Sequence, residues 1–300
     1  MSLKAAPLCG ILLLDKPLGL SSNAALQRVR HLLGRPKAGH TGSLDPLATG
    51  MLPICIGEAT KLAGELLAGR KAYTVAMQLG VRTDTGDAEG QVVEQCELPA
   101  LDAARIEAAL RGLRGPQQQV PPMYSALKRD GKPLYQLARA GLSVERPARP
   151  IEIYVLELLN YSAGVMRCRV ECSKGTYIRT LVEQIGVQLG SCAHVSALRR
   201  DFVEPFQGES MYRLETLEGS ATPPVLLEAD RAVGHLRAVR MSVAQSRAMS
   251  YGQAIEVTDL QPGQVRLYDA SGQFAGLGVC QDGGQVRPLR LFAAAVAGHP

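Results

Sequence analysis

The segment GHTGSLDPLATG, residues 39–50, contains the carboxylate with the clearest chemical potential in this 300-residue sequence, Asp45. Glycine and proline beside it predict a tight turn, in which an Asp-Pro pair has a structural role. A rigid turn can also hold a carboxylate at the floor of a pocket, where it acts as a nucleophile. The segment alone leaves both roles open.

Two further polar segments could complete a site with Asp45. RTDTGDAEG carries Asp87, and KGTYIRT carries Tyr177 and Arg179. A carboxylate in a closed pocket needs a cation to remain ionised, because desolvation raises its pKa and a neighbouring guanidinium lowers it. Arg179 is the candidate counter-ion. A nucleobase taken out of its stack needs an aromatic platform, for which Tyr73 or Tyr177 is available.

Local patterns predict the elements that must position these side chains. ILLLDKP predicts a short strand ended by proline, and SSNAALQRVRHLLG predicts a helix capped by Ser21 or Ser22. LDAARIEAALRGLRG predicts another helix, capped by Asp102, and KGTYIRTLVEQIGVQLG turns into a third. Apolar residues alternate with charged ones in VMRCRVECS, which predicts a half-buried antiparallel sheet.

The pattern changes towards the C-terminus. After the break LEGSATPP come short alternating runs with Gly-containing turns between them: AIEVTDL, QVRLYDA, FAGLGVC and VRPLRLF. Several short strands at close spacing predict a small barrel-like module. The sequence therefore predicts a larger domain over residues 1–236 and a small β-rich domain over residues 237–300.

Composition and motifs argue against several classes of protein. Hydrophobic residues make up 46% of the chain, as in soluble globular proteins, and the apolar run CGILLL is too short for a signal peptide or membrane span. Seven cysteines without a CxxC pair argue against a disulfide framework or a zinc site and favour a reducing cytoplasm. Nucleotide-cradling, zincin and serine-hydrolase motifs are absent, so we expect chemistry based on a carboxylate.

Positive charge is concentrated in one part of the chain. The net charge is +5, with 33 Lys and Arg against 28 Asp and Glu, and residues 105–149 contain nine basic residues against three acidic ones. Such a concentration favours either a solvated face or a surface that contacts phosphates.

Five sequence blocks occur in an order typical of one enzyme family. They are GHTGSLDPLATGMLPICIGEATK, LLLDKPLGLSSNAAL, KAYTVAMQLGVRTDTGDAEG, VPPMYSALKRDGKPLYQLAR and CSKGTYIRTLVEQIGVQLG. The first strongly resembles the catalytic motif of the TruB family of bacterial tRNA pseudouridine-55 synthases, and the others resemble further blocks of that family. The resemblance covers roughly residues 10–200, and the C-terminal segment looks more weakly like a PUA-type RNA-binding domain. A match of this length favours the nucleophile role for Asp45.

The resemblance implies a fold and a reaction. The implied fold is α+β: a pseudouridine synthase fold with a central, mostly antiparallel mixed sheet flanked by helices and loops, plus a small C-terminal β-rich PUA-like domain. The implied reaction isomerises uridine 55 in the T loop of tRNA by breaking the N1–C1′ bond and joining the ribose to C5. Because this is redox-neutral, we expect no metal or organic cofactor. The expected partner is the tRNA T stem-loop, with no membrane, no required protein partner and a monomeric chain in the cytoplasm.

The resemblance also implies roles for individual residues. Asp45 falls on the family's catalytic aspartate, Arg179 on the arginine that pairs with it, and Tyr73 on the tyrosine that stacks against the target base. Whether the aspartate attacks C1′, attacks C6 or assists a glycal route stays open. The implied substrate-binding residues are His40, Tyr73, Asp87, Tyr177, Leu198, Lys16 and Lys61.

The basic stretch from about 120 to 149 lies where the family carries an insertion that closes over the RNA. The resemblance therefore favours the phosphate-contacting explanation of its charge, since phosphate contacts add affinity without reading sequence.

Two alternatives are weighed against this function. A relative of the archaeal and eukaryotic box H/ACA enzymes would act on another RNA with guide RNA and partner subunits, and often has charged tails, which this sequence lacks. A non-catalytic RNA-binding or tRNA-folding protein would keep the fold without the chemistry. The intact set of Asp45, Tyr73 and Arg179 disfavours this second alternative.

Overall fold

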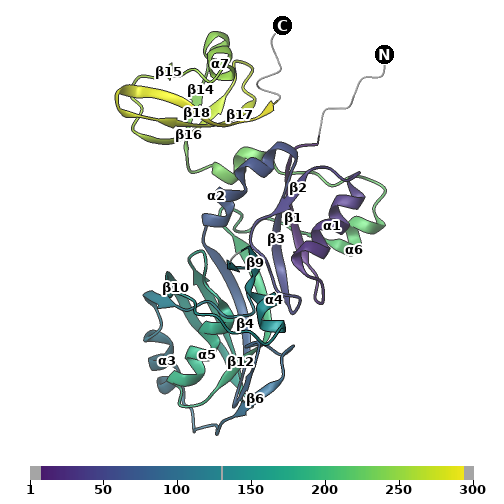
Figure 1. The fold of residues 1–300 in the computed structure, drawn as a ribbon, viewed down its shortest axis with the longest axis vertical. Coiled ribbons are helices and arrows are strands. Elements are labelled where there is room, and N and C mark those ends of the chain that lie inside the picture. The colour runs from purple at the N-terminus through teal and green to yellow at the C-terminus, as the bar shows by residue number, and fades with distance from the viewer. Residues whose placement is uncertain (1–7, 130, 294–300) are drawn as a thin grey trace.

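A computed structural model describes residues 8–129 and 131–293, which form a long mixed sheet and a separate five-stranded sheet (Figure 1). The long sheet has nine strands. Eight follow the order β13 (Tyr212–Arg213), β1 (Gly10–Lys16), β3 (Ala48–Ile56), β12 (Ala193–Val203), β4 (Lys71–Leu79), β11 (Val165–Cys172), β10 (Arg149–Ser162) and β7 (Gly115–Gln119), and β2 (Ala38–His40) pairs with β3.

Two of the pairings in this sheet are parallel, β1 with β13 and β3 with β12, and the others are antiparallel. The predicted mostly antiparallel mixed sheet is therefore confirmed. Apolar and charged residues alternate along β11, so that the apolar ones share the buried face of the sheet. As predicted, these side chains are at most 1% exposed: Met166, Cys168, Val170 and Cys172.

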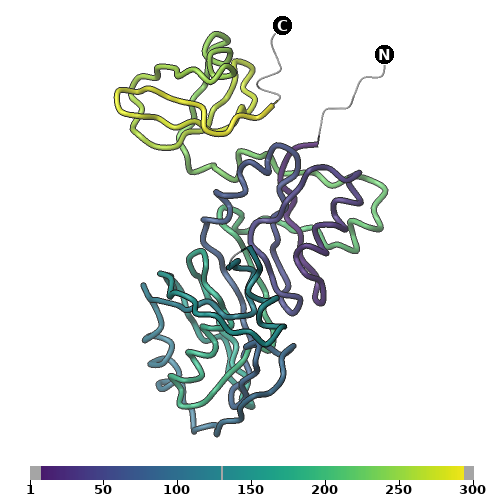
Figure 2. Tube along the Cα trace, viewed as in Figure 1, coloured from purple at the N-terminus to yellow at the C-terminus, as the bar shows by residue number. Residues whose placement is uncertain are grey.

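Helices cover the two ends of the long sheet. At one end α3 (Ala103–Arg111) and α5 (Ile178–Gln188) pack onto β4, β10, β11 and β12 around one hydrophobic core (Figure 1). At the other, α1 (Ser22–Leu32) lies beside α6 (Leu214–Gly219), which is far from it in sequence (Figure 2). Side-chain caps explain where two helices begin, because Ser21 accepts from the Ala24 amide and Asp102 from the Arg105 amide, as predicted.

Several connecting segments are short or irregular. The segment EATKLAGELLAG begins in a 3₁₀ helix, η1 (Gly57–Leu62), and continues as α2 (Ala63–Ala68). The segment RTDTGDAEG begins within β5 (Val81–Thr83), which pairs with β6 (Val92–Gln95). The basic stretch forms a small hairpin and a helix: β8 (Lys128–Arg129), β9 (Lys132–Pro133) and α4 (Leu134–Arg139).

The C-terminal sheet forms from the short alternating runs that the sequence indicated. Its order is β14 (Arg237–Arg240), β16 (Gly263–Tyr268), β17 (Phe274–Cys280), β18 (Gln285–Leu291) and β15 (Ile255–Glu256), accompanied by α7 (Val243–Ser250) and η3 (Asp282–Gly284). The 3₁₀ helix η2 (Ala229–Val233) joins it to the rest, since Leu277 and Phe292 share a core with Val233. The predicted division at residue 236 stays a prediction, and residues 1–7 and 294–300 of the predicted domains lie outside the described residues.

The expectation that the cysteines remain unpaired is wrong for two of them. Cys96 and Cys192 form a disulfide across a sequence separation of 96 residues. Both lie beside Gly80, which accepts from the Cys96 amide and donates to the Cys192 carbonyl. Cysteine spacing cannot reveal such a pair, because the sheet brings the two together.

None of the helices in the described ranges is long and apolar enough to cross a membrane.

Candidate active site

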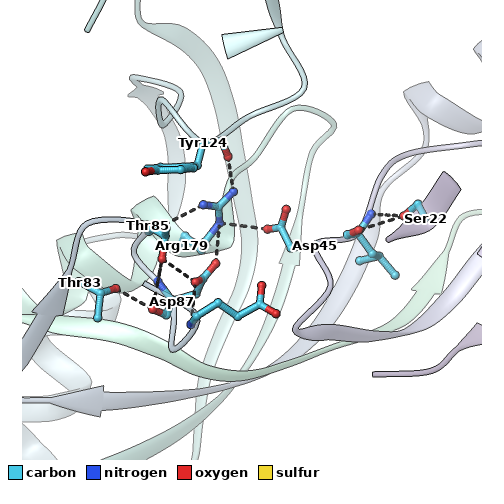
Figure 3. Close-up of polar contacts among 9 residues, drawn as sticks. Ser22, Asp45, Thr83, Thr85, Asp87, Tyr124 and Arg179 are labelled. Carbon is cyan, nitrogen blue, oxygen red and sulfur yellow. Dashed lines mark hydrogen bonds and ion pairs between the residues drawn. The ribbon is translucent and has the colours of Figure 1, made fainter. Parts of the chain in front are cut away.

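Asp45 lies in the short loop between β2 and β3, and this loop is held from several sides. Ser22, at the start of α1, accepts a hydrogen bond from the Leu44 amide (2.7 Å) and donates one to the Leu44 carbonyl (3.0 Å) (Figure 3). The Ala48 amide donates to the Asp45 carbonyl at 3.0 Å, which closes the turn predicted around the Asp-Pro pair. The carboxylate therefore stands on a fixed backbone.

The guanidinium of Arg179, in the first turn of α5, contacts two carboxylates and two carbonyls (Figure 3). Its Nε lies 3.0 Å from Asp45 Oδ2 and 3.7 Å from Asp87 Oδ2. Its Nη1 donates to the Thr85 carbonyl (2.7 Å) and its Nη2 to the Tyr124 carbonyl (2.6 Å). The ion pair predicted between Asp45 and Arg179 is present, and the backbone fixes its cationic partner in place.

Asp87 belongs to the same network and is only 4% exposed. Thr85 Oγ1 donates to Asp87 Oδ1 at 2.6 Å, and the Glu89 amide donates to the same oxygen at 3.1 Å. Thr83 Oγ1 donates to the Asp87 carbonyl at 2.7 Å. The Asp- and Thr-rich segment after β5 thus folds on itself and presents its carboxylate to Arg179.

Burial sets the protonation behaviour of Asp45. Desolvation raises its pKa above the ordinary value, and the charge of Asp87 adds to this rise, while Arg179 and Lys16 oppose it. The side chain keeps 44% of its surface open to the cavity beside it. Arg179 therefore lowers the pKa of Asp45 as predicted, but it does not fully offset the desolvation.

A cavity of about 580 Å³ opens beside the ion pair. The β2–β3 loop, β4, the basic stretch, the start of α5 and β12 all contribute to its walls. Five predicted site residues line it: Asp45, Tyr73, Tyr177, Arg179 and Leu198. Pockets for small molecules commonly have volumes of roughly 300–1,000 Å³, so the cavity has room for a nucleotide.

The two tyrosines of the cavity are positioned by neighbouring strands. Tyr73, on β4, is 7% exposed, and burial raises its pKa, with Arg200 acting in the opposite direction. Tyr177 precedes α5, and the buried Gln119 holds its backbone by accepting from its amide (2.8 Å) and donating to its carbonyl (3.1 Å). Burial also raises the pKa of Tyr177. Both rings are therefore fixed in the cavity wall as neutral phenols.

Four predicted substrate-binding residues are not among those that line this cavity: Asp87, His40, Lys16 and Lys61. Asp87 faces Arg179, and its substrate contact stays a prediction. His40 lies on β2, where burial lowers its pKa and its Nδ1 has no hydrogen-bond partner in the described part of the chain. Lys16 is fully buried and its Nζ donates to the carbonyls of Pro17 (2.8 Å) and Leu20 (2.6 Å), and burial lowers its pKa to about 8.

The contacts of Lys61 also differ from the predicted contact with substrate. Its Nζ pairs with Glu58 (2.6 Å) and donates to the Leu291 carbonyl (2.7 Å), so it connects η1 to the C-terminal sheet. The substrate contacts expected of His40, Lys16 and Lys61 stay predictions.

Comparison with known proteins identifies the family. The family model described as "TruB family pseudouridylate synthase (N terminal domain)" matches residues 30–178. Proteins named tRNA pseudouridine synthase B are 48% identical in Chromohalobacter salexigens, over 97% of both chains, and 50% identical in Stutzerimonas stutzeri, over 94% of this chain and 95% of the relative. The chain belongs to the TruB family of pseudouridine synthases. Two C-terminal models of that family match residues 179–239 and 238–292.

Solved structures confirm the fold of this TruB-family chain. A crystal structure of a Cbf5-Nop10-Gar1 complex superposes with a TM-score of 0.68 and 22% identity, covering 97% of this chain and 81% of the other. An H/ACA RNP bound to a substrate RNA containing 2′-deoxyuridine gives a TM-score of 0.70 with 23% identity, covering 94% and 84%. At such identities the likeness supports the pseudouridine synthase fold alone.

The TruB-family cavity also contains two buried cations that sequence reasoning missed, Lys71 and Arg200. Lys71 Nζ donates to the carbonyls of Leu67 (2.8 Å) and Gly69 (2.6 Å), and burial lowers its pKa to about 8. One available signal pointed to Arg200: side chains two apart on a strand share a face, so a cavity-lining Leu198 implied a cavity-lining Arg200.

Proposed function

We propose that this TruB-family protein converts uridine 55 in the T loop of tRNA to pseudouridine, with Asp45 as the nucleophile on a flipped-out nucleotide. The observation that carries the proposal is the meeting of Asp45, Arg179 and Tyr73 in one cavity of nucleotide size. The names of the relatives, tRNA pseudouridine synthase B, support tRNA as the substrate.

In the proposed reaction the N1–C1′ bond breaks, the uracil turns within the cavity, and C5 joins C1′. The proton lost from C5 is balanced by the proton gained at N1, so no oxidant or reductant enters. Asp45 attacks C1′ or C6, or assists a glycal route, and each of these routes needs an ionised carboxylate. Arg179 supplies the charge that favours this form and fixes its orientation.

The remaining cavity residues hold the nucleotide. The Tyr73 ring offers a flat face for the flipped base, and Tyr177 and Leu198 bound the rest of the base site. Taking a nucleotide out of a loop costs less than taking it from a duplex, because fewer pairing contacts are lost. A cavity of about 580 Å³ therefore has room for the base to turn while the nucleotide stays bound.

The basic stretch and the C-terminal sheet provide the RNA-binding surfaces of the proposal. Residues 120–149 form one rim of the cavity through Ser125, Ala126 and Leu127, and their charge suits phosphates of the T stem-loop. We assign residues 1–236 to catalysis and 237–300 to a PUA-like RNA-binding domain. We expect activity of the monomeric chain in the cytoplasm without metal ion, cofactor, guide RNA or partner protein.

Release of tritium from tRNA labelled at uracil C5 tests this function. The purified protein is expected to release label from an unmodified tRNA transcript with no added cofactor, and to release none from a transcript in which position 55 is cytidine. Asp45→Asn is expected to abolish release while RNA affinity stays within about threefold, since the change removes a charge and little volume. Asp282→Asn, at an exposed position on η3, serves as the matched control.

Two results would contradict the proposal. Label released at the wild-type rate by Asp45→Asn excludes the nucleophile assignment. Wild-type protein that binds tRNA but releases no label supports the non-catalytic alternative, and release that requires guide RNA supports the box H/ACA alternative.

A further inference from the structure

Arg200 occupies the centre of the nine-stranded sheet, on a strand that contributes to the cavity wall. Strand β12 lies between β3 and β4, and Arg200 is opposite Gly50 of β3 on one side and Tyr73 of β4 on the other. The residue is 1% exposed, and its side chain reaches the cavity wall. It is thus adjacent both to the strand that follows the Asp45 loop and to the strand that carries the base-stacking tyrosine.

The guanidinium of Arg200 holds both ends of the segment 42–51, which carries Asp45, includes the first four residues of β3 and is called the Asp45 loop below. Its Nη2 donates to the Gly42 carbonyl at 3.0 Å, before Asp45, and its Nε donates to the Met51 carbonyl at 2.7 Å, after Asp45. One rigid planar group therefore fixes the separation between the two ends of the loop.

The backbone of Arg200 is equally close to the end of this loop. A Cβ on Gly50 would lie 2.2 Å from the Arg200 carbonyl oxygen, and Gly50 has a φ of +99°, which favours glycine. The chain after Asp45 can approach β12 this closely only because Gly50 has no side chain. Side chain and main chain of one residue thus both determine where the loop sits.

Arg200 differs from Arg179 in its charge partners. Arg179 has two carboxylates within 4.0 Å, whereas the ion pairs in residues 8–129 and 131–293 include none to Arg200. Burying a cation without a carboxylate partner costs folding free energy. An apolar side chain of similar volume would stabilise the core more, so packing alone does not explain an arginine here. The unpaired charge also acts on its surroundings, since it opposes the raised pKa of Tyr73 and contributes to the lowered pKa of His40.

We propose that Arg200 is a positioning residue of the reaction: its guanidinium clamps the two ends of the Asp45 loop and sets the carboxylate against Tyr73 across the cavity. The proposal rests on the function proposed above, in which Asp45 and Tyr73 act on one flipped nucleotide. Without the clamp, Asp45 and Tyr73 are still present but are displaced relative to each other. A displacement of about 1 Å can lower the rate on the order of 100-fold.

Arg200→Lys tests the clamp, because lysine keeps the charge but cannot donate to both carbonyls from a planar group. Single-turnover tritium release is expected to fall by about 100-fold while the Kd for tRNA changes by less than about threefold. Arg199→Lys is the matched control: this neighbour on the same strand points away from the cavity and pairs with Asp15 at 2.9 and 3.0 Å. We expect its rate to stay within about threefold of wild type.

Hydrogen exchange supplies a readout that does not depend on activity. In Arg200→Lys, amides in the peptide that spans residues 42–50 are expected to exchange about tenfold faster, while α3 and the C-terminal sheet stay at wild-type rates. Arg200→Gln, which keeps a donor and loses the charge, is expected to give the same local change. Arg199→Lys should leave the peptide protected.

The outcomes separate this proposal from the proposed function. If the wild-type protein releases no tritium, the function fails, and exchange in residues 42–50 still decides whether the clamp exists. The positioning role is overturned by unchanged local exchange, by exchange that rises throughout the chain, or by an Arg200→Lys variant whose affinity for tRNA falls as much as its rate.

Discussion

The two sheets of the molecule differ in what they bury. Within the nine-stranded part, five charged side chains are at most 7% exposed: Lys16, Lys71, Asp87, Arg179 and Arg200. In the described residues of the C-terminal sheet, 237–293, Ser246 is the one buried polar side chain. Charges are expensive to bury, and three of these five, Lys71, Arg179 and Arg200, line one cavity, so the difference supports the proposed place of the chemistry.

The strongest test of this difference is to remove Arg179, the buried cation that is paired with carboxylates. Arg179→Met leaves Asp45 and Asp87 facing each other without a guanidinium, and we expect single-turnover tritium release to fall by about 10³-fold. Because Arg179 lowers the pKa of Asp45, its loss should also move the acidic limb of the pH–rate profile to higher pH. The exposed arginine of the Arg82–Glu94 pair, changed to Met, provides the control, with a rate within about twofold of wild type.

A result for Arg179→Met within tenfold of the wild-type rate would show that the buried ion pair is structural. In that case the contrast between the sheets would reflect packing rather than chemistry.

The disulfide offers a second test, because it stabilises only the nine-stranded part. Cys192→Ser is expected to lower the unfolding free energy of that part by about 2–4 kcal/mol, since the bond closes a long loop. Differential scanning calorimetry with and without reductant measures the effect, and Cys280→Ser, on the C-terminal sheet, is the comparison. Reductant that leaves the wild-type transition unmoved would contradict the expected stabilisation.

Removal of surface charge is expected to give a smaller effect, and it tests the proposed RNA-binding surfaces. Changing Lys128, Arg129 and Lys132 together to Gln is expected to raise the Kd for tRNA by roughly 10-fold and reduce the salt slope by about 2. The single-turnover rate at saturating tRNA should stay nearly constant. Changing Arg287 and Arg290, exposed on β18, tests the C-terminal sheet in the same way. An unchanged salt slope would identify the basic stretch as a solvated face.

The smallest expected effect concerns stability and pH. Burial raises the folded-state pKa of Asp45, so the native state holds this proton more tightly than the unfolded chain does. The associated stability is present below the unfolded pKa of about 4 and is lost as pH rises through the folded value. Because the Asp45 side chain is 44% exposed, solvent screens much of this effect, and Asp45→Asn is expected to raise the Tm at pH 7 by no more than about 1 °C, with a smaller gain near pH 4. Asp282→Asn should give no such gain, and a lower Tm for Asp45→Asn at pH 7 would show that pairing with Arg179 outweighs burial.

Local sequence patterns predicted most of the helices and strands, but only some of the side-chain contacts between them. Alternation placed β11, and short polar side chains placed the starts of α1 and α3, because these signals act over a few residues. The pairing of Asp45 with Arg179 followed from the need of a buried carboxylate for a cation and from the family resemblance. The family resemblance did not reveal that Lys61 holds the C-terminal sheet, since that contact joins residues 230 apart in sequence.

Arg200 and the disulfide escaped prediction for the same physical reason. The role of Arg200 depends on β12 lying between β3 and β4, an order that local patterns do not encode. Its neighbour Arg199 has the same side chain and a different environment, so composition alone could not separate the two, although alternation from Leu198 could assign Arg200 to the cavity face. Cys96 and Cys192 are likewise ordinary in their local sequence and become partners only in the folded sheet.

The disulfide separates the residues of the cavity into two groups, those within the closed loop of chain and those outside it. It closes a covalent ring of chain that contains the whole basic stretch and Arg179, while Asp45 and Tyr73 lie outside the ring. A single proteolytic cut within residues 120–149 would open the rim of the cavity yet leave both fragments tethered through Cys96 and Cys192. A nicked chain would therefore keep Asp45 and Arg179 covalently joined until a reductant cleaves the disulfide.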